Sequence, residues 1–363
     1  DNVAHNHDHA SLSSALTAFF NGFQEWSVDP TDPVRRQGVI HRADQLVEQF
    51  GQVDARLRES ENAWIGSIQE DVRSANTLLD KIASINERIA VLEGSSRGIA
   101  TELRDARQSA LEDLAKLVNF DVAYPGGAAK GAVLSLRNDS GSTTQLLDGR
   151  HVLGDFAYDP ATGDLTFGAG GTVLEPSGGS IHGHMVARAD YFEPVRSRVD
   201  AIADQVVTAV NATYAGATGA PVFFDPAGLT AGTIARDSSN TSDTLVAGNT
   251  PDSGDNTVAR ELGRLASRAF DTGAGDAISG TFIDHVTRTA EEVGSRVKQA
   301  ESLWNTQELA TEALVGRRNE LGGVSLDEEV ADLIRFQRAF EGSARVIRVV
   351  DQLLETIVNE LVR

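Results

Sequence analysis

The feature that most constrains the fold is a single helical pattern running from Pro33 to Leu92. Its apolar residues alternate at spacings of four and three, which places them along one face of a helix. At 1.5 Å per residue, a continuous helix over this range is roughly 90 Å long, too long for a compact globule. The sequence therefore predicts an elongated, rod-like helical bundle of long antiparallel helices.

The apolar pattern changes phase once within this stretch. The first run consists of Val39, Ala43, Leu46, Phe50, Val53, Leu57, Ser60 and Trp64. After a slip of one residue, the pattern resumes as Ile65, Ile68, Val72, Ala75, Leu79, Ile82, Asn86 and Ile89. Gly66 lies at the slip and is the predicted position of a break if the helix is not continuous.

A second long helix is predicted at the end of the chain, from Ser325 to Arg363. Ser325 with Glu328 three residues later is a capping-box pattern that marks its start. Apolar residues recur at heptad spacing, which suits packing against another helix in this chain or in a neighbour. An ordinary core helix is the alternative. The predicted assembly interface consists of Leu326, Val330, Leu333, Phe340, Ile347, Leu354, Ile357 and Leu361.

The middle of the chain has a different character. Between residues 119 and 185, glycine, threonine and aspartate separate short apolar runs at 132–136, 145–147, 165–167 and 172–174, which predicts a small antiparallel β region of hairpins. Shorter helices are predicted at 11–26, 99–118, 191–214, 256–269 and 279–318. The first has one apolar face and ends at a proline turn, residues 29–33; the face consists of Leu12, Leu16, Phe19, Phe20 and Phe23. The fold class is therefore mainly α with a β insert, ending in a terminal coiled-coil-type helix.

Three regions follow from these patterns. Residues 1–10 are polar and predict a flexible tail. Residues 11–322 form the rod-like helical core with its β-hairpin region at about 119–185. Residues 323–363 hold the C-terminal helix. A further segment preceding Asp1 is also expected, since the chain does not start with Met.

Composition limits the kinds of partner. The chain carries 32 basic and 53 acidic residues, a formal net charge of −21. Nucleic acids and anionic membranes attract the opposite sign, so neither is an expected partner. The absence of cysteine excludes disulfides, thiol catalysis and cysteine-based metal sites. No apolar run is long enough to cross a membrane.

Two groups of closely spaced histidines are the candidate metal ligands. His5, His7 and His9 alternate in the first ten residues, while His182 and His184 would share one face if their segment were a strand. His182 and His184 have no carboxylate beside them at ligand spacing, and a flexible terminus organises the ligands His5, His7 and His9 poorly. No zinc-protease, nucleophile-elbow or phosphate-loop motif occurs. We therefore expect no enzyme activity, no cofactor and no metal site, and keep a metal-dependent binding module or enzyme as a distant alternative.

Several motifs resemble those of the flagellar hook-associated proteins. The most specific run from Gly323 to Glu329, reading GVSLDEE, followed by Leu333–Gln337, reading LIRFQ, and by Ala344–Ile347, reading ARVI. Phe223-Phe224 and Gly254-Asp255-Asn256 resemble two further motifs of the family, in the same order. The second of these favours the branch that joins hook to filament. Gly342 departs from the pattern, since family members usually carry alanine there.

The resemblance implies a structural, non-enzymatic component of the bacterial flagellum. A protein of this family is expected to act as an adaptor between hook and filament and to be exported to the cell exterior by the flagellar secretion apparatus. Its implied partners are the hook protein, the second junction protein, copies of itself in a ring and an export chaperone. Flagellin or the second junction protein is the nearer alternative, because their architecture is similar.

Overall fold

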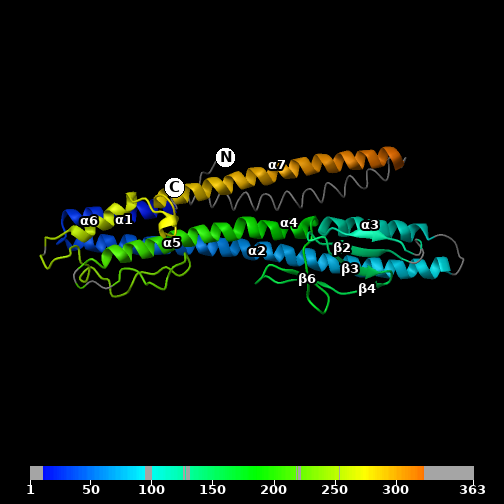
Figure 1. The fold of residues 1–363 in the computed structure, drawn as a ribbon, viewed down its shortest axis with the longest axis horizontal. Coiled ribbons are helices and arrows are strands. Elements are labelled where there is room, and N and C mark those ends of the chain that lie inside the picture. Colours follow the sequence, from blue (N-terminus) through cyan, green and yellow to red (C-terminus); the bar gives the residue numbers. More distant parts are fainter. Residues whose placement is uncertain are drawn as a thin grey trace, which may run out of the picture. The chain divides into compact units, whose positions relative to one another are not determined.

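The computed structural model describes residues 11–94, 100–125, 127, 131–217, 219, 222–252 and 254–322, with residues 318–322 described by their backbone alone. Helices dominate these residues, and two small antiparallel sheets lie between them in the chain (Figure 1). The prediction of a mainly α fold with a β insert is confirmed. The terminal helix predicted at 325–363 lies outside the described residues.

The helices and strands follow one another in a simple order (Figure 1). The helices are α1 (Leu12–Val28), α2 (Pro33–Gly94), α3 (Thr101–Leu117), α4 (Gly179–Ala187), α5 (Glu193–Tyr214), α6 (Thr257–Arg264) and α7 (Phe282–Gly322). A π-helical turn, Arg188–Phe192, joins α4 to α5, and short 3-10 turns occur at Leu265–Ser267 and Thr272–Ala274. The strands are β1 (Asp121–Ala123), β2 (Val133–Arg137), β3 (Thr143–Asp148), β4 (His151–Val152), β5 (Phe156–Tyr158), β6 (Leu165–Phe167) and β7 (Thr172–Leu174).

The chain divides into two compact units. Unit 1 comprises the described residues of Asp1–Leu57 and Pro194–Arg363, and unit 2 is Arg58–Glu193. The helix α2 continues through the boundary as a single element of 62 residues. The break considered at Gly66 is therefore not found. A Cβ at Gly66 would have no atom within 4 Å, so this glycine meets no packing demand that interrupts the helix.

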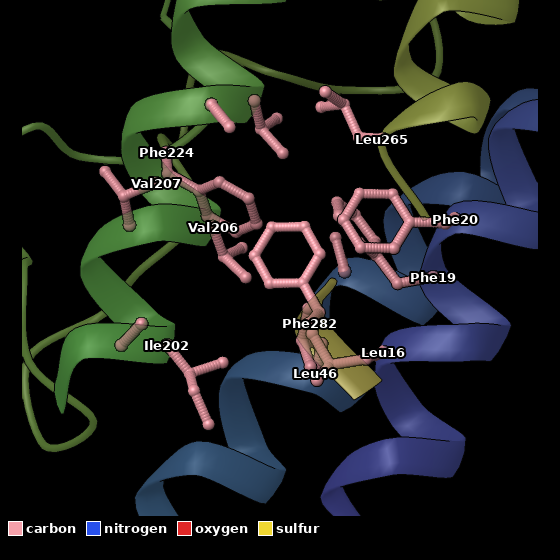
Figure 2. Packing of buried hydrophobic residues seen from close by; sticks show 14 of the residues in the cluster. Leu16, Phe19, Phe20, Leu46, Ile202, Val206, Val207, Phe224, Leu265 and Phe282 are labelled. Carbon is pink, nitrogen blue, oxygen red and sulfur yellow. The ribbon is translucent and has the colours of Figure 1, made fainter. Parts of the chain in front are cut away.

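Unit 1 has an aromatic core. The predicted apolar face of α1 is fully buried, and its phenylalanines meet side chains from α5, α7 and the loop after α5 (Figure 2). The ring of Phe19 lies 5.9 Å from that of Phe223 and 5.7 Å from that of Phe224, centroid to centroid. Phe20 stacks on Phe282, at the first residue of α7, at 5.2 Å. Tilted and stacked ring pairs of this kind add to the free energy gained by burial.

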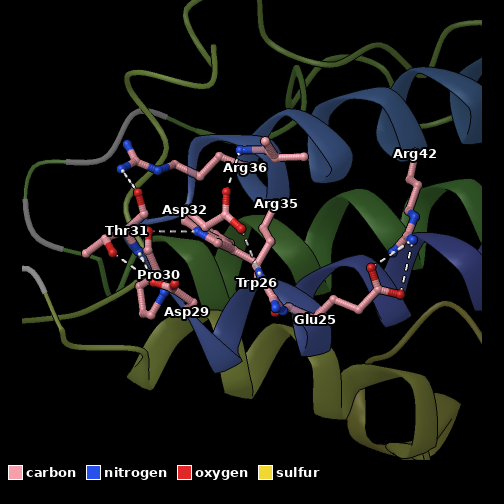
Figure 3. A network of polar contacts seen from close by, with 10 residues as sticks. Glu25, Trp26, Asp29, Pro30, Thr31, Asp32, Arg35, Arg36 and Arg42 are labelled. Carbon is pink, nitrogen blue, oxygen red and sulfur yellow. Dashed lines mark hydrogen bonds and ion pairs between the residues drawn. The ribbon is translucent and has the colours of Figure 1, made fainter.

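The turn between α1 and α2 is held by polar contacts around a buried tryptophan (Figure 3). Trp26 donates its indole N–H to the carbonyl of Pro30 at 3.1 Å. The Asp29 carboxylate accepts from the backbone N–H and the hydroxyl of Thr31, and these bonds lower the pKa of Asp29 below its ordinary value. Arg36 donates to the Thr31 carbonyl and to that of Ser242. The predicted proline turn is therefore a fixed corner of unit 1.

Unit 2 packs two sheets against helices. The four-stranded sheet has the order β1-β2-β3-β4 and the three-stranded sheet the order β5-β6-β7, and all pairings are antiparallel. Their inward side chains pack with α2, α3 and α4 in one apolar cluster. The cluster includes Ile68, Val72, Leu79, Leu114, Leu134, Leu147, Phe156, Leu165 and Ile181. Alternation of buried and exposed residues in β2 and β5 matches a sheet with one covered face.

Side-chain amides attach extended segments to the helices. Asn76 of α2 donates to the carbonyl of Phe156 at 2.9 Å and accepts from its N–H at 2.8 Å, as a neighbouring strand would. Asn211 of α5 accepts from the N–H groups of Phe223 and Phe224 and donates to the carbonyl of Phe224. Each amide satisfies backbone groups that would otherwise lack a partner away from water.

The β insert differs from its prediction at its end. Residues 179–185 were predicted to belong to the hairpin region, but they lie in α4. Burial of Ile181 in the unit 2 cluster stabilises this helix although Gly179 and Gly183 disfavour it. The predicted strands 165–167 and 172–174 are confirmed as β6 and β7.

Candidate assembly surface

The described residues contain no constellation that would bind a metal. No group of three or more His, Asp or Glu side chains in the described ranges is arranged to hold an ion. His5, His7 and His9 lie outside these ranges. None of the described helices is long and apolar enough to cross a membrane.

His182 and His184 do not share a face, because their segment is helical. Residues i and i+2 of an α-helix are rotated by about 200° from each other, so the two rings point to different sides. The His184 Nε2 atom lies 3.4 Å from a carboxylate oxygen of Asp71, which also accepts a hydrogen bond from the Ser180 hydroxyl at 2.6 Å. These contacts explain His184 as a packing residue of unit 2.

The eight residues of the predicted interface lie outside the described residues. They are Leu326, Val330, Leu333, Phe340, Ile347, Leu354, Ile357 and Leu361. Their packing remains a prediction. The helix that precedes them, α7, is described to Gly322, and its exposed side chains form the candidate surface.

The first half of α7 is fixed in unit 1. Phe282 is buried at the start of the helix (Figure 2). Val286 and Val293 continue this buried row along the helix. Arg198 of α5 forms an ion pair with Glu292, which also pairs with Arg296 at 2.6 Å. The first half of α7 is therefore held by apolar packing and by ion pairs within unit 1.

His285 lies in the first half of α7, and its surroundings alter its pKa. Burial lowers the pKa of His285, and the positive charges of Arg198 and Arg288 lower it further. Its Nε2 atom is buried and has no hydrogen-bond partner among the described residues. The imidazole is therefore held in its neutral form, which suits an apolar helix contact.

The second half of α7 exposes large apolar side chains. Leu303, Trp304 and Leu314 are 64%, 42% and 69% exposed. Leu303 and Leu314 lie eleven residues apart, which is within about 20° of three full turns, and Trp304 lies about 100° from Leu303. Leu309, 67% exposed, lies on another side. The three residues Leu303, Trp304 and Leu314, called the outer row of α7 below, form one apolar face.

The outer row is a surface that the sequence analysis did not identify. A helix was predicted at 279–318, but burial could not be read from the pattern, since the same spacing serves a core helix equally well. A contiguous exposed apolar face on a helix marks a candidate surface for contact with another protein. In the chain, the outer row directly precedes the predicted stripe that begins at Leu326.

Comparison with known proteins gives this geometry a context. Residues 1–222 match the family profile described as flagellar hook-associated protein FlgK helical domain. Residues 318–361 match the profile described as flagellar basal body rod FlgEFG protein C-terminal. The two profiles thus cover the region of α1 to α5 and the region of the predicted terminal stripe.

Three individual proteins extend this result. Flagellar hook-associated protein 1 of Bacillus subtilis is 25% identical over 400 residues, covering 99% of this chain and 78% of that protein. Its counterpart in Salmonella typhimurium is 27% identical over 221 residues, covering 56% of this chain and 38% of the relative. The structure of the flagellar hook junction protein FlgK from Burkholderia pseudomallei has a TM-score of 0.51 at 22% identity, covering 60% of this chain and 41% of that one. This last similarity concerns the fold.

Proposed function

Because this chain belongs to the FlgK family of flagellar hook-associated proteins, we propose that it is a structural subunit of the junction between hook and filament. It is a structural component of the flagellum and works by helix packing, without a catalytic step. The family profile over residues 1–222 supports this assignment most strongly, since it covers the helices α1 to α5 that build both units. The match to first hook-associated proteins favours this role over flagellin or the second junction protein.

The assembly surface has two parts in this proposal. The first is the outer row of α7, which is exposed in the described structure. The second is the stripe from Leu326 to Leu361, whose heptad spacing suits a helix seam. Together they would bury a continuous run of apolar side chains when neighbouring helices cover them, and this burial would drive assembly.

The proposed partners follow from the family. Flagellar association implies contact with the hook, and the finer proposal adds the second junction protein, copies of this chain in a ring and an export chaperone. The chain spans 78% of the Bacillus relative and 38% of the Salmonella relative, so these partners are proposed for the shared regions. Export through the flagellar secretion apparatus would place the protein outside the cell.

Substitutions in the outer row test the packing proposal. The full-length protein carrying Leu314→Asp would be expressed in a strain that lacks the wild-type gene, and swimming and filament number would be measured. Asn305→Asp is the matched control, since it adds the same charge on the opposite side of α7. A charge in an apolar helix contact costs several kcal/mol unless it is paired, at about 2–7 kcal/mol for a polar group alone.

The two variants give a clear decision. We expect Leu314→Asp to abolish filament attachment and Asn305→Asp to restore it to the wild-type level. Equal swimming of both variants would show that the outer row is not part of the assembly surface. Family membership would stand in that case, because it rests on the sequence and fold comparisons.

A further inference from the structure

The helix that runs from α4 into α5 contains one wide turn. Between Arg188 and Phe192 the backbone is π-helical, and the N–H of Glu193 donates to the carbonyl of Arg188, five residues back. A π turn accommodates about one residue more than an α turn and is rare in proteins. Two causes are available in the sequence: Pro194, which follows directly, and the side chains that pack on the turn.

Pro194 accounts for a disturbance of the helix but not for its form. A proline inside a helix has no N–H to donate to the carbonyl four residues earlier, and its ring presses against that carbonyl. Such a position can kink, open or widen the helix. A second influence is therefore needed to explain why a single wide turn is adopted.

That influence is visible at Trp64 of α2. The indole ring lies 4.6 Å from the ring of His184, edge-on, and 5.8 Å from the ring of Phe192, measured between centroids. Two regular turns take about 7.2 residues, so residues eight apart would be rotated by about 80° from each other. The extra residue taken up by the π turn removes this rotation and brings His184 and Phe192 onto one face.

Polar contacts hold the same turn. The indole N–H of Trp64 donates to the carbonyl of His184 at 3.1 Å. Arg188, the first residue of the wide turn, donates to the hydroxyl of Tyr158 at 3.2 Å and lies 3.9 Å from the carboxylate of Glu61. Its guanidinium packs on Gly163, where an added Cβ would lie 2.4 Å from a terminal guanidinium nitrogen of Arg188. All of these contacts lie within residues 58–193.

We propose that Trp64 is the residue that selects the π turn, acting as a clasp that fixes the helix carrying His184 and Phe192 against α2. Pro194 disturbs the helix but is not required for the π turn, and the contacts of the indole impose this turn. Without the clasp, the segment from 184 to 196 returns to regular α-helical phase. A residue of α2 therefore determines whether the backbone between α4 and α5 is π-helical or α-helical.

The absence of cysteine allows a direct distance measurement. Gly183→Cys and Ser197→Cys place two spin labels on exposed positions either side of the turn, and a Cβ at Gly183 meets nothing within 4 Å. In a regular helix, fourteen residues end about 40° short of four turns, so the two labels lie on nearly the same side. The π turn reduces the rotation between the two labelled positions by about 100°, the rotation of one residue, and so places the labels on nearly opposite sides.

The doubly labelled parent chain is compared with its Trp64→Ala, Pro194→Ala and Ile65→Ala variants by electron paramagnetic resonance. We expect Trp64→Ala to shorten the main label distance by several ångström, while Pro194→Ala leaves it unchanged. Ile65→Ala is the matched control, since it removes a partly buried apolar side chain next to Trp64, and it should also leave the distance unchanged. Circular dichroism verifies that each variant is folded.

Trp64→Phe covers the case in which Trp64→Ala does not fold. It keeps an aromatic ring but loses the N–H that binds the His184 carbonyl, so we expect a second population at the shorter distance. An unchanged distance in Trp64→Ala would overturn the proposal. If Trp64→Ala does not fold, the absence of the shorter population in Trp64→Phe would overturn it. Shortening by Pro194→Ala or by Ile65→Ala would overturn it as well, because the turn would then depend on the proline or on general packing.

Discussion

The side-chain oxygen of Asn86, a fully buried residue of α2, accepts a hydrogen bond from the guanidinium of Arg107 in α3 at 2.9 Å. The same amide donates to the carbonyl of Gly149 at 2.5 Å and accepts from the N–H of Ala132 at 3.3 Å. One side chain thus links two helices with both ends of the β2–β3 hairpin. Arg107 is only 4% exposed, and its guanidinium also lies over the ring of Tyr124.

Removing this amide is predicted to destabilise unit 2 strongly. Asn86→Ala leaves the backbone groups of Ala132 and Gly149 buried without this partner and deprives Arg107 of one acceptor. Each such loss costs about 1–3 kcal/mol, so we expect the free energy of unfolding to fall by about 3 kcal/mol. Urea titration measures it. Asn62→Ala, at an exposed position of the same helix, should change it by less than about 0.5 kcal/mol. Equal losses in both variants would refute the role of the amide.

The carboxylate of Asp255 anchors the loop before α6. One oxygen accepts from the N–H groups of Asn249 and Thr250, and the other accepts from the N–H of Thr257. Hydrogen bonds from Thr257 and Thr250 hold the pKa of Asp255 far below its ordinary value. A Cβ added at Gly248 would lie 2.3 Å from the carboxyl carbon, so the site also requires that glycine.

This arrangement predicts a dependence on acid. A group whose pKa is lower in the folded state stabilises the fold above its unfolded pKa of about 3.8, and this stability is lost as the pH falls towards the folded value. In Asp255→Asn the thermal midpoint should be lower at pH 7 and should change less below pH 4. Parallel acid-unfolding curves for the variant and the parent chain would contradict this account.

His285 predicts a second effect of pH, at a higher range. Its pKa is lowered in the folded state, so below about pH 6.5 the unfolded chain binds a proton that the folded chain does not. Stability should therefore fall as the pH drops through 6.5 and level off below the folded pKa. Thermal unfolding of His285→Gln between pH 5 and 8 should lack this component. The prediction is wrong if the variant and the parent lose stability in parallel.

The terminal stripe yields a prediction about assembly. In the full-length protein, Leu333→Asp and Ile347→Asp should each abolish assembly, because an unpaired charge in a dry helix seam costs several kcal/mol, of the order of 3–5. Gln352→Asp, on the opposite side of the predicted heptad, is the control. Motility assays measure assembly, and circular dichroism shows whether both units stay folded. Wild-type motility in the stripe variants would exclude the seam.

Periodicity was enough to predict the helices that pack along one face. The buried residues of α1 and α2 match the predicted rows, because a long amphipathic pattern leaves few alternatives. The strands β1, β4 and β5 were missed, since runs of two or three residues carry little pattern. Their position depends on partners far along the chain, such as Asn76, which lies 80 residues before Phe156.

The candidate surface was predicted only in part. The stripe at 326–361 could be read from its heptads, but the exposure of Leu303 and Leu314 could not, because burial depends on which elements are near in space. Residues 179–185 were predicted to belong to the β-hairpin region but lie in α4. Gly179 and Gly183 give no local helix signal, and the contact of His184 with Trp64 joins residues 120 apart in the chain.

The most direct test of the junction role is deletion of the full-length gene in its native host, with electron microscopy of the cells and assay of flagellin in the medium. A subunit that joins hook to filament is required for filament attachment but not for hook formation. The account predicts bare hooks and flagellin released into the medium, with both restored by the wild-type gene. Normal filaments on the deletion strain would contradict it.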